Sequence, residues 1–159
     1  MSFYTLSQGA VAASTSTDSK TIRSTASGAG SVLRVHELFM GGQDGSNSVL
    51  TIRINRPSTA ASGTAPSTQT PRPIDPASAA AAFTAYGTYG GTANWQTAAT
   101  LHTDDLLTAG FNAFGGVWRW VAPPEAYLVI GGTGATSDVD VRSGSGTGTY
   151  TAHYLIEQR

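Results

Sequence analysis

Short segments in which apolar and polar residues alternate recur along the chain, and each predicts a β-strand. Val49–Asn55 is the clearest, because Leu and Ile occupy every second position while Thr, Arg and Asn fill the others. Successive side chains of an extended chain point to opposite faces, so such a segment has one apolar face. Segments 32–40, 117–121 and 149–157 follow the same rule. The residues expected in the core are Val35, Leu50, Ile52, Ile54, Trp118, Trp120, Val129, Tyr150, Tyr154 and Ile156.

The order of these segments predicts an all-β fold. Turn-forming residues separate the strands, most densely at 41–47. One short helix is expected to begin at Asp75 and to stop by Gly87, and a second short helix or a turn is expected to begin at Thr103 and to end at Gly110. Six to eight strands with one or two short helices indicate an antiparallel β-sandwich, jelly-roll-like in arrangement, and not a parallel α/β sheet.

The chain divides by composition into a short arm and one domain. Residues 1–31 consist mostly of Gly, Ala, Ser and Thr, and they predict a low-complexity N-terminal arm with a short strand. Residues 32–159 are expected to form a single β-sandwich domain. Five of the seven prolines fall within 57–76, which predicts an extended Pro-rich arm of that domain, because proline lacks the N–H that a sheet interior requires.

Composition excludes several classes of protein. Only 12% of the 159 residues are charged, the formal net charge is −1, and cysteine is absent. These values exclude a charge-rich disordered chain, a disulfide framework and a strongly basic nucleic-acid binder. No apolar run approaches the roughly 20 residues that a membrane span needs. The N-terminus has no signal-peptide pattern. We therefore expect no nucleic-acid partner, no membrane partner and synthesis in a cytoplasm.

A glycine-rich run at 131–134 follows the apolar segment 127–130 and looks like the start of a nucleotide-binding turn. Such a turn needs a helix behind it, so that the helix N-terminus can bind a pyrophosphate. The next segment, 138–142, alternates like a strand instead. The run is therefore predicted to be a hairpin loop, and no cofactor is expected.

The titratable residues show no spacing typical of a catalytic or metal site. His36, His102 and His153 lie far apart in sequence, and the first and last are expected to be hydrogen-bonded structural residues of strands. Asp138 and Asp140 occupy the polar positions of an alternating segment, which predicts a solvated face. No catalytic residue and no metal ligand is predicted, and the enzyme class is disfavoured.

Segment 117–130, with the sequence VWRWVAPPEAYLVI, resembles the penultimate hairpin of small β-sandwich proteins that decorate the heads of tailed bacteriophages. The proline-framed run 71–76 and the closing strand 150–157 stand in the order expected around it. The resemblance extends over residues 30–158 in segment order. It implies a capsid decoration, or cement, protein and transfers no catalytic residue. The candidate protein-interface residues are Phe3, Tyr4, Ile22, Arg23, Arg72, Ile74 and Arg119.

The expected function is that of a structural virion protein that binds the outer surface of a bacteriophage capsid and stabilises it. Its expected partners are the major capsid protein and neighbouring copies of itself, with a homotrimer as one arrangement. A surface of small uncharged side chains suits such a coat, because its burial costs little desolvation and little rotamer entropy. The alternative is a receptor- or glycan-binding β-sandwich module of a phage tail or cell surface. An enzyme using a nucleotide at 131–134 is the least favoured hypothesis.

Overall fold

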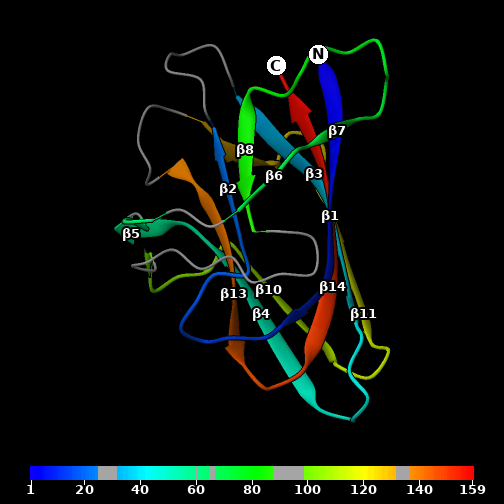
Figure 1. Cartoon of the computed structure of the whole chain (residues 1–159), viewed down its shortest axis with the longest axis vertical. Coiled ribbons are helices and arrows are strands. Elements are labelled where there is room, and N and C mark those ends of the chain that lie inside the picture. The colour runs from blue at the N-terminus through cyan, green and yellow to red at the C-terminus, as the bar shows by residue number, and fades with distance from the viewer. Residues whose placement is uncertain (25–31, 60, 65–66, 88–98, 132–136) are drawn as a thin grey trace.

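The chain forms an antiparallel β-sandwich in the computed structural model, which describes residues 1–24, 32–59, 61–64, 67–87, 99–131 and 137–159 (Figure 1). This confirms the expected all-β class. The described residues form fourteen strands and not six to eight, because the connecting loops add pairs of only two or three residues to the long strands. They contain no α-helix.

The first sheet is built on three long antiparallel strands, β3, β14 and β1. Its order is β11-β3-β14-β1-β7, and β12 pairs with β3 beyond the end of β11. Ser2 pairs with Gln158, so both termini lie at one end of the sheet (Figure 1). The strands of this sheet are β1 (Ser2–Ala12), β3 (Leu33–Gly42), β7 (Arg72–Pro73), β11 (Val117–Val121), β12 (Leu128–Ile130) and β14 (Thr149–Gln158).

The second sheet packs its apolar side against the first. Its order is β10-β4-β13-β2-β8-β6, and a separate two-stranded sheet pairs β5 (Pro57–Thr59) with β9 (Thr100–Leu101). The strands of the second sheet are β2 (Lys20–Ser24), β4 (Val49–Asn55), β6 (Thr68–Gln69), β8 (Phe83–Tyr86), β10 (Leu107–Asn112) and β13 (Val139–Ser145).

The core lies between the two sheets and contains most of the residues expected there. Trp118 and Trp120 are partly buried and pack against it. The prediction that Val129 lies in the core is wrong, because this residue is 42% exposed. Its neighbours Leu128 and Ile130 turn inward instead. The expected core residues that are buried are Val35, Leu50, Ile52, Ile54, Tyr150, Tyr154 and Ile156.

Neither expected helix forms in the described residues, because sheet pairing takes the same segments. Near residue 75 there is only a turn, in which Asp75 accepts hydrogen bonds from the main-chain N–H groups of Ala77 and Ser78. The chain then becomes β8, and Phe83 packs edge-on against Tyr4 with ring centroids 5.6 Å apart. The second segment becomes β10, which pairs with β4 and buries Phe111. Burial in the sandwich outweighs the local helix signals.

The N-terminal segment differs from the expected arm with a short strand. β1 runs for 11 residues between β14 and β7, and β2 lies between β13 and β8. Tyr4 and Ile22, expected at an interface, are 1% and 0% exposed and belong to the core. Residues 2–24 therefore contribute interior strands to both sheets. The Pro-rich stretch 57–76 contributes β6 and β7 at the margins of the two main sheets and β5 to the separate two-stranded sheet.

Candidate functional site

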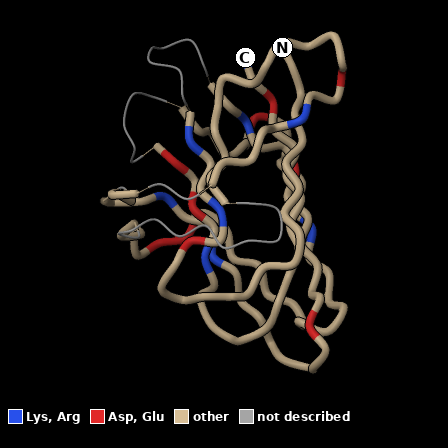
Figure 2. The backbone as a smooth tube through the Cα atoms, viewed as in Figure 1, with Lys and Arg blue, Asp and Glu red and all other residues tan. Residues whose placement is uncertain are grey.

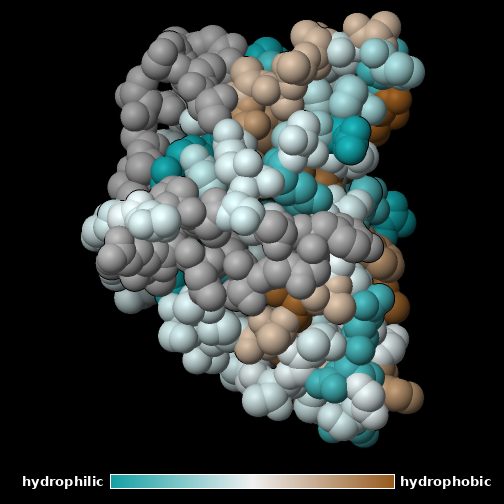
Figure 3. Space-filling view, in the orientation of Figure 1, coloured by the Kyte–Doolittle hydropathy of each residue, from teal (hydrophilic) through white to brown (hydrophobic). Residues whose placement is uncertain are grey.

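The outer side of the first sheet is the candidate functional site, and we call it the open face. It consists of the alternate residues that point away from the core on β1, β3, β11, β12 and β14. In Figure 3, apolar surface appears along the margin where Figure 1 places β11. The residues that define the open face are Phe3, Thr5, Arg34, Glu37, Phe39, Val117, Arg119, Val121, Val129, His153 and Leu155.

Apolar side chains on the open face are exposed to solvent. Val117 is 61% exposed, Val121 is 54% exposed and Phe39 is 39% exposed. The register places Phe39 between Arg119 and His153, so these side chains form one row across three strands. Several exposed apolar side chains on neighbouring strands of one sheet face are typical of a protein–protein contact surface.

One ion pair crosses the middle of this surface. Arg119 Nε donates to Glu37 Oε1 at 2.7 Å, and its side chain is 60% exposed. The hydrogen bond from Arg119 lowers the pKa of the Glu37 carboxyl. An exposed ion pair of this kind adds little to the stability of the fold. It does leave Arg119 and Glu37 together without net charge.

A cluster of aromatic and basic side chains occupies the other end of the open face. His36 Nε2 lies 2.7 Å from Glu157 Oε2, and its ring centroid lies 4.5 Å from that of Tyr127 and 5.3 Å from that of Phe3. The guanidinium of Arg34 lies over the Tyr127 ring, 5.2 Å from its centroid. An open depression of about 660 Å³ borders this cluster, lined by Arg34, Pro124, Glu125, Tyr127, Val129 and Arg159.

Glu157 is the buried carboxylate under that cluster. Burial favours its neutral form, but hydrogen bonds from Arg159 and His36 outweigh this, and its pKa lies below the usual value. The interpretation of His36 as a hydrogen-bonded structural residue is confirmed. His153 is also hydrogen-bonded, with Nδ1 3.0 Å from Ser7 Oγ.

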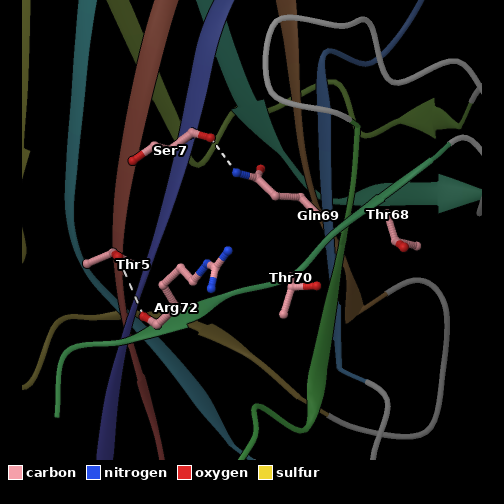
Figure 4. Close-up of a pocket in the computed structure, with 6 residues that line it drawn as sticks. All are labelled: Thr5, Ser7, Thr68, Gln69, Thr70 and Arg72. Carbon is pink, nitrogen blue, oxygen red and sulfur yellow. Dashed lines mark hydrogen bonds between the residues drawn. The ribbon is translucent and has the colours of Figure 1, made fainter. Parts of the chain in front are cut away.

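A smaller polar depression of about 320 Å³ lies beside β1 and β7 (Figure 4). Gln69 reaches across it and donates to the main-chain oxygen of Ser7. On its other side, Gln69 Oε1 accepts a bond of 2.8 Å from the buried Lys20, and desolvation lowers the pKa of that lysine to about 8. The residues lining the depression are Thr5, Ser7, Thr68, Gln69, Thr70 and Arg72.

The outer side of the second sheet, which we call the covered face, carries a buried charge network. Figure 2 shows charged residues gathered along β2, β13 and β4. Arg23 pairs with Asp138 at 2.6 Å, and Arg142 pairs with Asp18 at 2.7 Å. Arg142 also donates to the main-chain oxygen of Ala99 at 2.8 Å.

The expectation that Asp138 and Asp140 are solvated is wrong. They are only 2% and 1% exposed. Thr21 Oγ1 donates to Asp140 Oδ1 at 2.6 Å, but Asp140 Oδ2 and Asp18 Oδ2 are buried without a hydrogen-bond partner. Desolvation, and then repulsion from Asp18, raises the pKa of Asp140 to about 7. Three buried carboxyl groups here face the two guanidinium groups of Arg23 and Arg142.

The sequence-predicted interface residues divide between the surface and the interior. Phe3 and Arg119 lie on the open face, and Arg72 lines the polar depression beside it. Ile74 is 58% exposed and lines an adjoining hollow with Phe3. Arg23 belongs to the covered face through Asp138. Tyr4 and Ile22 are core residues, as described above.

Asp18 was not identified from the sequence as a member of the charge network. No sequence pattern marks this residue, and only the fold brings it to β13.

No family model, no curated protein and no solved structure matches this chain. The class established by the structure is an antiparallel all-β sandwich.

The glycine-rich run at 131–134 lies outside the described residues except for Gly131. Among the described residues, no helix has the length and apolar character needed to cross a bilayer, and no three His, Cys, Asp or Glu side chains are grouped to hold a metal ion.

Proposed function

We propose that this protein is a structural virion protein that binds the outer surface of a bacteriophage capsid through its open face and stabilises the shell. The observation that carries the proposal is a sheet surface on which Phe39, Val117, Val121 and Val129 remain exposed. Its partners are the major capsid protein and neighbouring copies of itself.

The physical chemistry of the open face favours such an assembly. The central strands β3, β14 and β1 pair with a neighbour on each side, so the open-face side chains that they carry lose little backbone freedom on docking, while β11 and β12 are anchored to β3. Burying apolar area yields roughly 25 cal/mol per Å² before the costs of association. A modest contact repeated on every subunit of a shell gains strength through multivalency.

The family resemblance points to the same part of the molecule. Segment 117–130 forms β11, a turn and β12, and both strands pair with β3 at the border of the open face. The residues that resemble a head decoration protein therefore border the surface with exposed apolar side chains.

Binding to undecorated phage heads tests the proposal. Purified protein is mixed with heads, the heads are sedimented, and bound protein is measured against free protein. We expect saturable binding that Val129→Asp and Phe39→Asp each weaken at least about tenfold, because a buried unpaired carboxylate costs more than 1.4 kcal/mol.

Val49→Asp is the matched control, because Val49 is 73% exposed on the second sheet. It should bind heads as the wild type does. Absence of saturable wild-type binding would overturn the capsid proposal. Equal losses in all three variants would overturn the assignment to the open face.

A second candidate function is receptor or glycan binding. The observation favouring it is the polar depression beside β1 and β7, whose hydroxyl, amide and guanidinium groups suit sugar hydroxyls. Trp118 and Trp120 pack against the core, so the polar groups of this depression would carry the recognition. Arg72→Ala and Thr70→Val should then abolish glycan-array binding without changing binding to heads, and an array without signal for the wild type would contradict this function.

A further inference from the structure

The edge strand β11 presents a free row of main-chain hydrogen-bonding groups. Within the part of the chain that the structure describes, β11 pairs with β3 alone and ends the first sheet there. In Figure 1 it forms the margin of the sandwich. Edge strands of this kind can accept a further strand, and many proteins block them with lysine, proline or a bulge. β11 has the sequence VWRWV and contains neither lysine nor proline.

The hydrogen bonds flanking β11 show which residues face outward. Gly42 N donates to Gly116 O, and Ala122 N donates to His36 O, both at 2.8 Å. Antiparallel strands alternate between residues that bond to the neighbour and residues that do not. The even-numbered residues from 116 to 122 therefore bond to β3. The main-chain N–H and C=O groups of Val117, Arg119 and Val121 point away from the sheet.

The sequence of β11 reads the same in both directions. An antiparallel copy centred on Arg119 places Val117 opposite Val121 of the other copy, and Trp118 opposite Trp120. The first of these pairs exchanges main-chain hydrogen bonds, while the tryptophan pair falls at a position without such bonds, where side chains approach more closely. Aromatic and β-branched cross-strand pairs are favourable in sheets. Only a second copy of this strand matches every position in this way.

The two Arg119 side chains meet at the centre of such a pair. Like charges directly opposite each other oppose pairing. Here each guanidinium is bonded at 2.7 Å to Glu37 of its own chain, so each copy brings a neutralised ion pair to the symmetry axis. The central position therefore does not prevent association while Glu37 remains ionised.

We propose that two copies of this chain associate through β11, antiparallel about a two-fold axis at Arg119, so that their first sheets join into one continuous sheet. The three outward-facing residues of each copy then find main-chain partners. Both open faces lie on the same side of the joined sheet, which doubles the apolar surface available to a partner. This association concerns the free protein and does not depend on the proposed binding to capsids.

Charge variants test the pairing directly. Wild-type protein should sediment at twice the 16.3 kDa of one chain. Val117→Glu/Val121→Glu and Val117→Lys/Val121→Lys each place like charges opposite one another, so each should sediment as a monomer. An equimolar mixture of the two should return to a dimer, because glutamate then faces lysine at both ends. A monomeric wild type, or dimeric separate variants, would overturn the proposal.

A cysteine variant tests the register independently of these charges. The chain has no native cysteine, and Arg119 is the only β11 position that would meet itself across the axis. Arg119→Cys should form a disulfide-linked dimer under mild oxidation, whereas Val49→Cys, at a more exposed position on the second sheet, should not. Equal crosslinking of both variants, or none in Arg119→Cys, would contradict the register.

The variant Glu37→Gln tests whether the Arg119–Glu37 ion pair lowers the repulsion at the two-fold axis, without changing a residue of β11. Glu37 lies on β3 and has no place in the strand pairing itself. Its neutralisation leaves two unpaired guanidinium groups at the axis, so association should weaken most at low salt and recover at high salt. Association unchanged at every salt concentration would contradict the assigned geometry.

Discussion

The outer faces of the two sheets differ in what they expose to solvent and in whether their charged side chains are buried. On the open face, Phe39, Val117 and Val121 remain in solvent beside one exposed ion pair. On the covered face, the carboxylates of Asp18, Asp138 and Asp140 are buried, and Arg142 bonds both to Asp18 and to the main-chain oxygen of Ala99. Both faces belong to strands with similar alternation. Alternation therefore assigns a residue to one side of a sheet, whereas the cover over that side decides whether the residue meets water.

The largest expected difference between the faces is the cost of losing an arginine. Arg142→Met on the covered face leaves Asp18 without its cation in a buried site, which should lower the free energy of unfolding by about 3–5 kcal/mol. Arg119→Met on the open face should leave the urea midpoint unchanged, because water solvates Glu37. Urea unfolding of both variants at one protein concentration measures the difference, and similar losses would contradict it.

The covered face should also make stability depend on pH. The usual pKa of Asp140 is 3.8 and the folded chain raises it to about 7, so folding takes up a proton between these values. The free energy of unfolding should therefore fall by as much as a few kcal/mol as the pH rises from 5 to 8. Glu157 acts in the opposite direction only at more acidic pH, where its lowered pKa is titrated.

Asp140→Asn should remove much of this dependence and stabilise the protein at pH 8. Asp104→Asn is the matched control, because Asp104 is exposed. Urea unfolding at both pH values measures the effect. A wild type that becomes more stable between pH 5 and pH 8 would contradict the assignment.

The smallest expected contrast comes from two isosteric substitutions. Val139→Thr places a hydroxyl in the core, where Val139 is 2% exposed, and should cost about 1–3 kcal/mol. Val129→Thr places the same group on the open face and should change stability by no more than about 0.5 kcal/mol. Thermal unfolding of both variants tests the placement of Val129, and a larger loss for Val129→Thr would contradict it.

The sequence predicted the class and most of the core because long strands have an unambiguous period. Val49–Asn55 and the last strand keep their apolar residues on one side over many positions, and the structure buries that side. Val129 was assigned to the wrong face because β12 has only three residues, all apolar. A segment of three apolar residues shows no alternation of apolar and polar positions, so the sequence does not reveal which side chain faces the core.

The candidate site was only partly visible in the sequence. Arg119 was correctly expected at the surface, opposite the two tryptophans of β11. Tyr4 was expected at an interface, yet β14 and β7 flank its strand and its side chain is buried in the core. Asp140 was expected in solvent because polar residues at alternating positions usually face water.

The sequence by itself determined the strands, their apolar sides and the self-complementary order of β11, because these depend on residues adjacent along the chain. Only the tertiary structure decided which polar sides are covered, which edge lacks a partner and where Asp18 meets Asp140. Those outcomes depend on contacts between residues far apart in sequence, such as Asp18 with Arg142 and Arg23 with Asp138. No local pattern encodes such contacts, because many strand orders satisfy the same alternation.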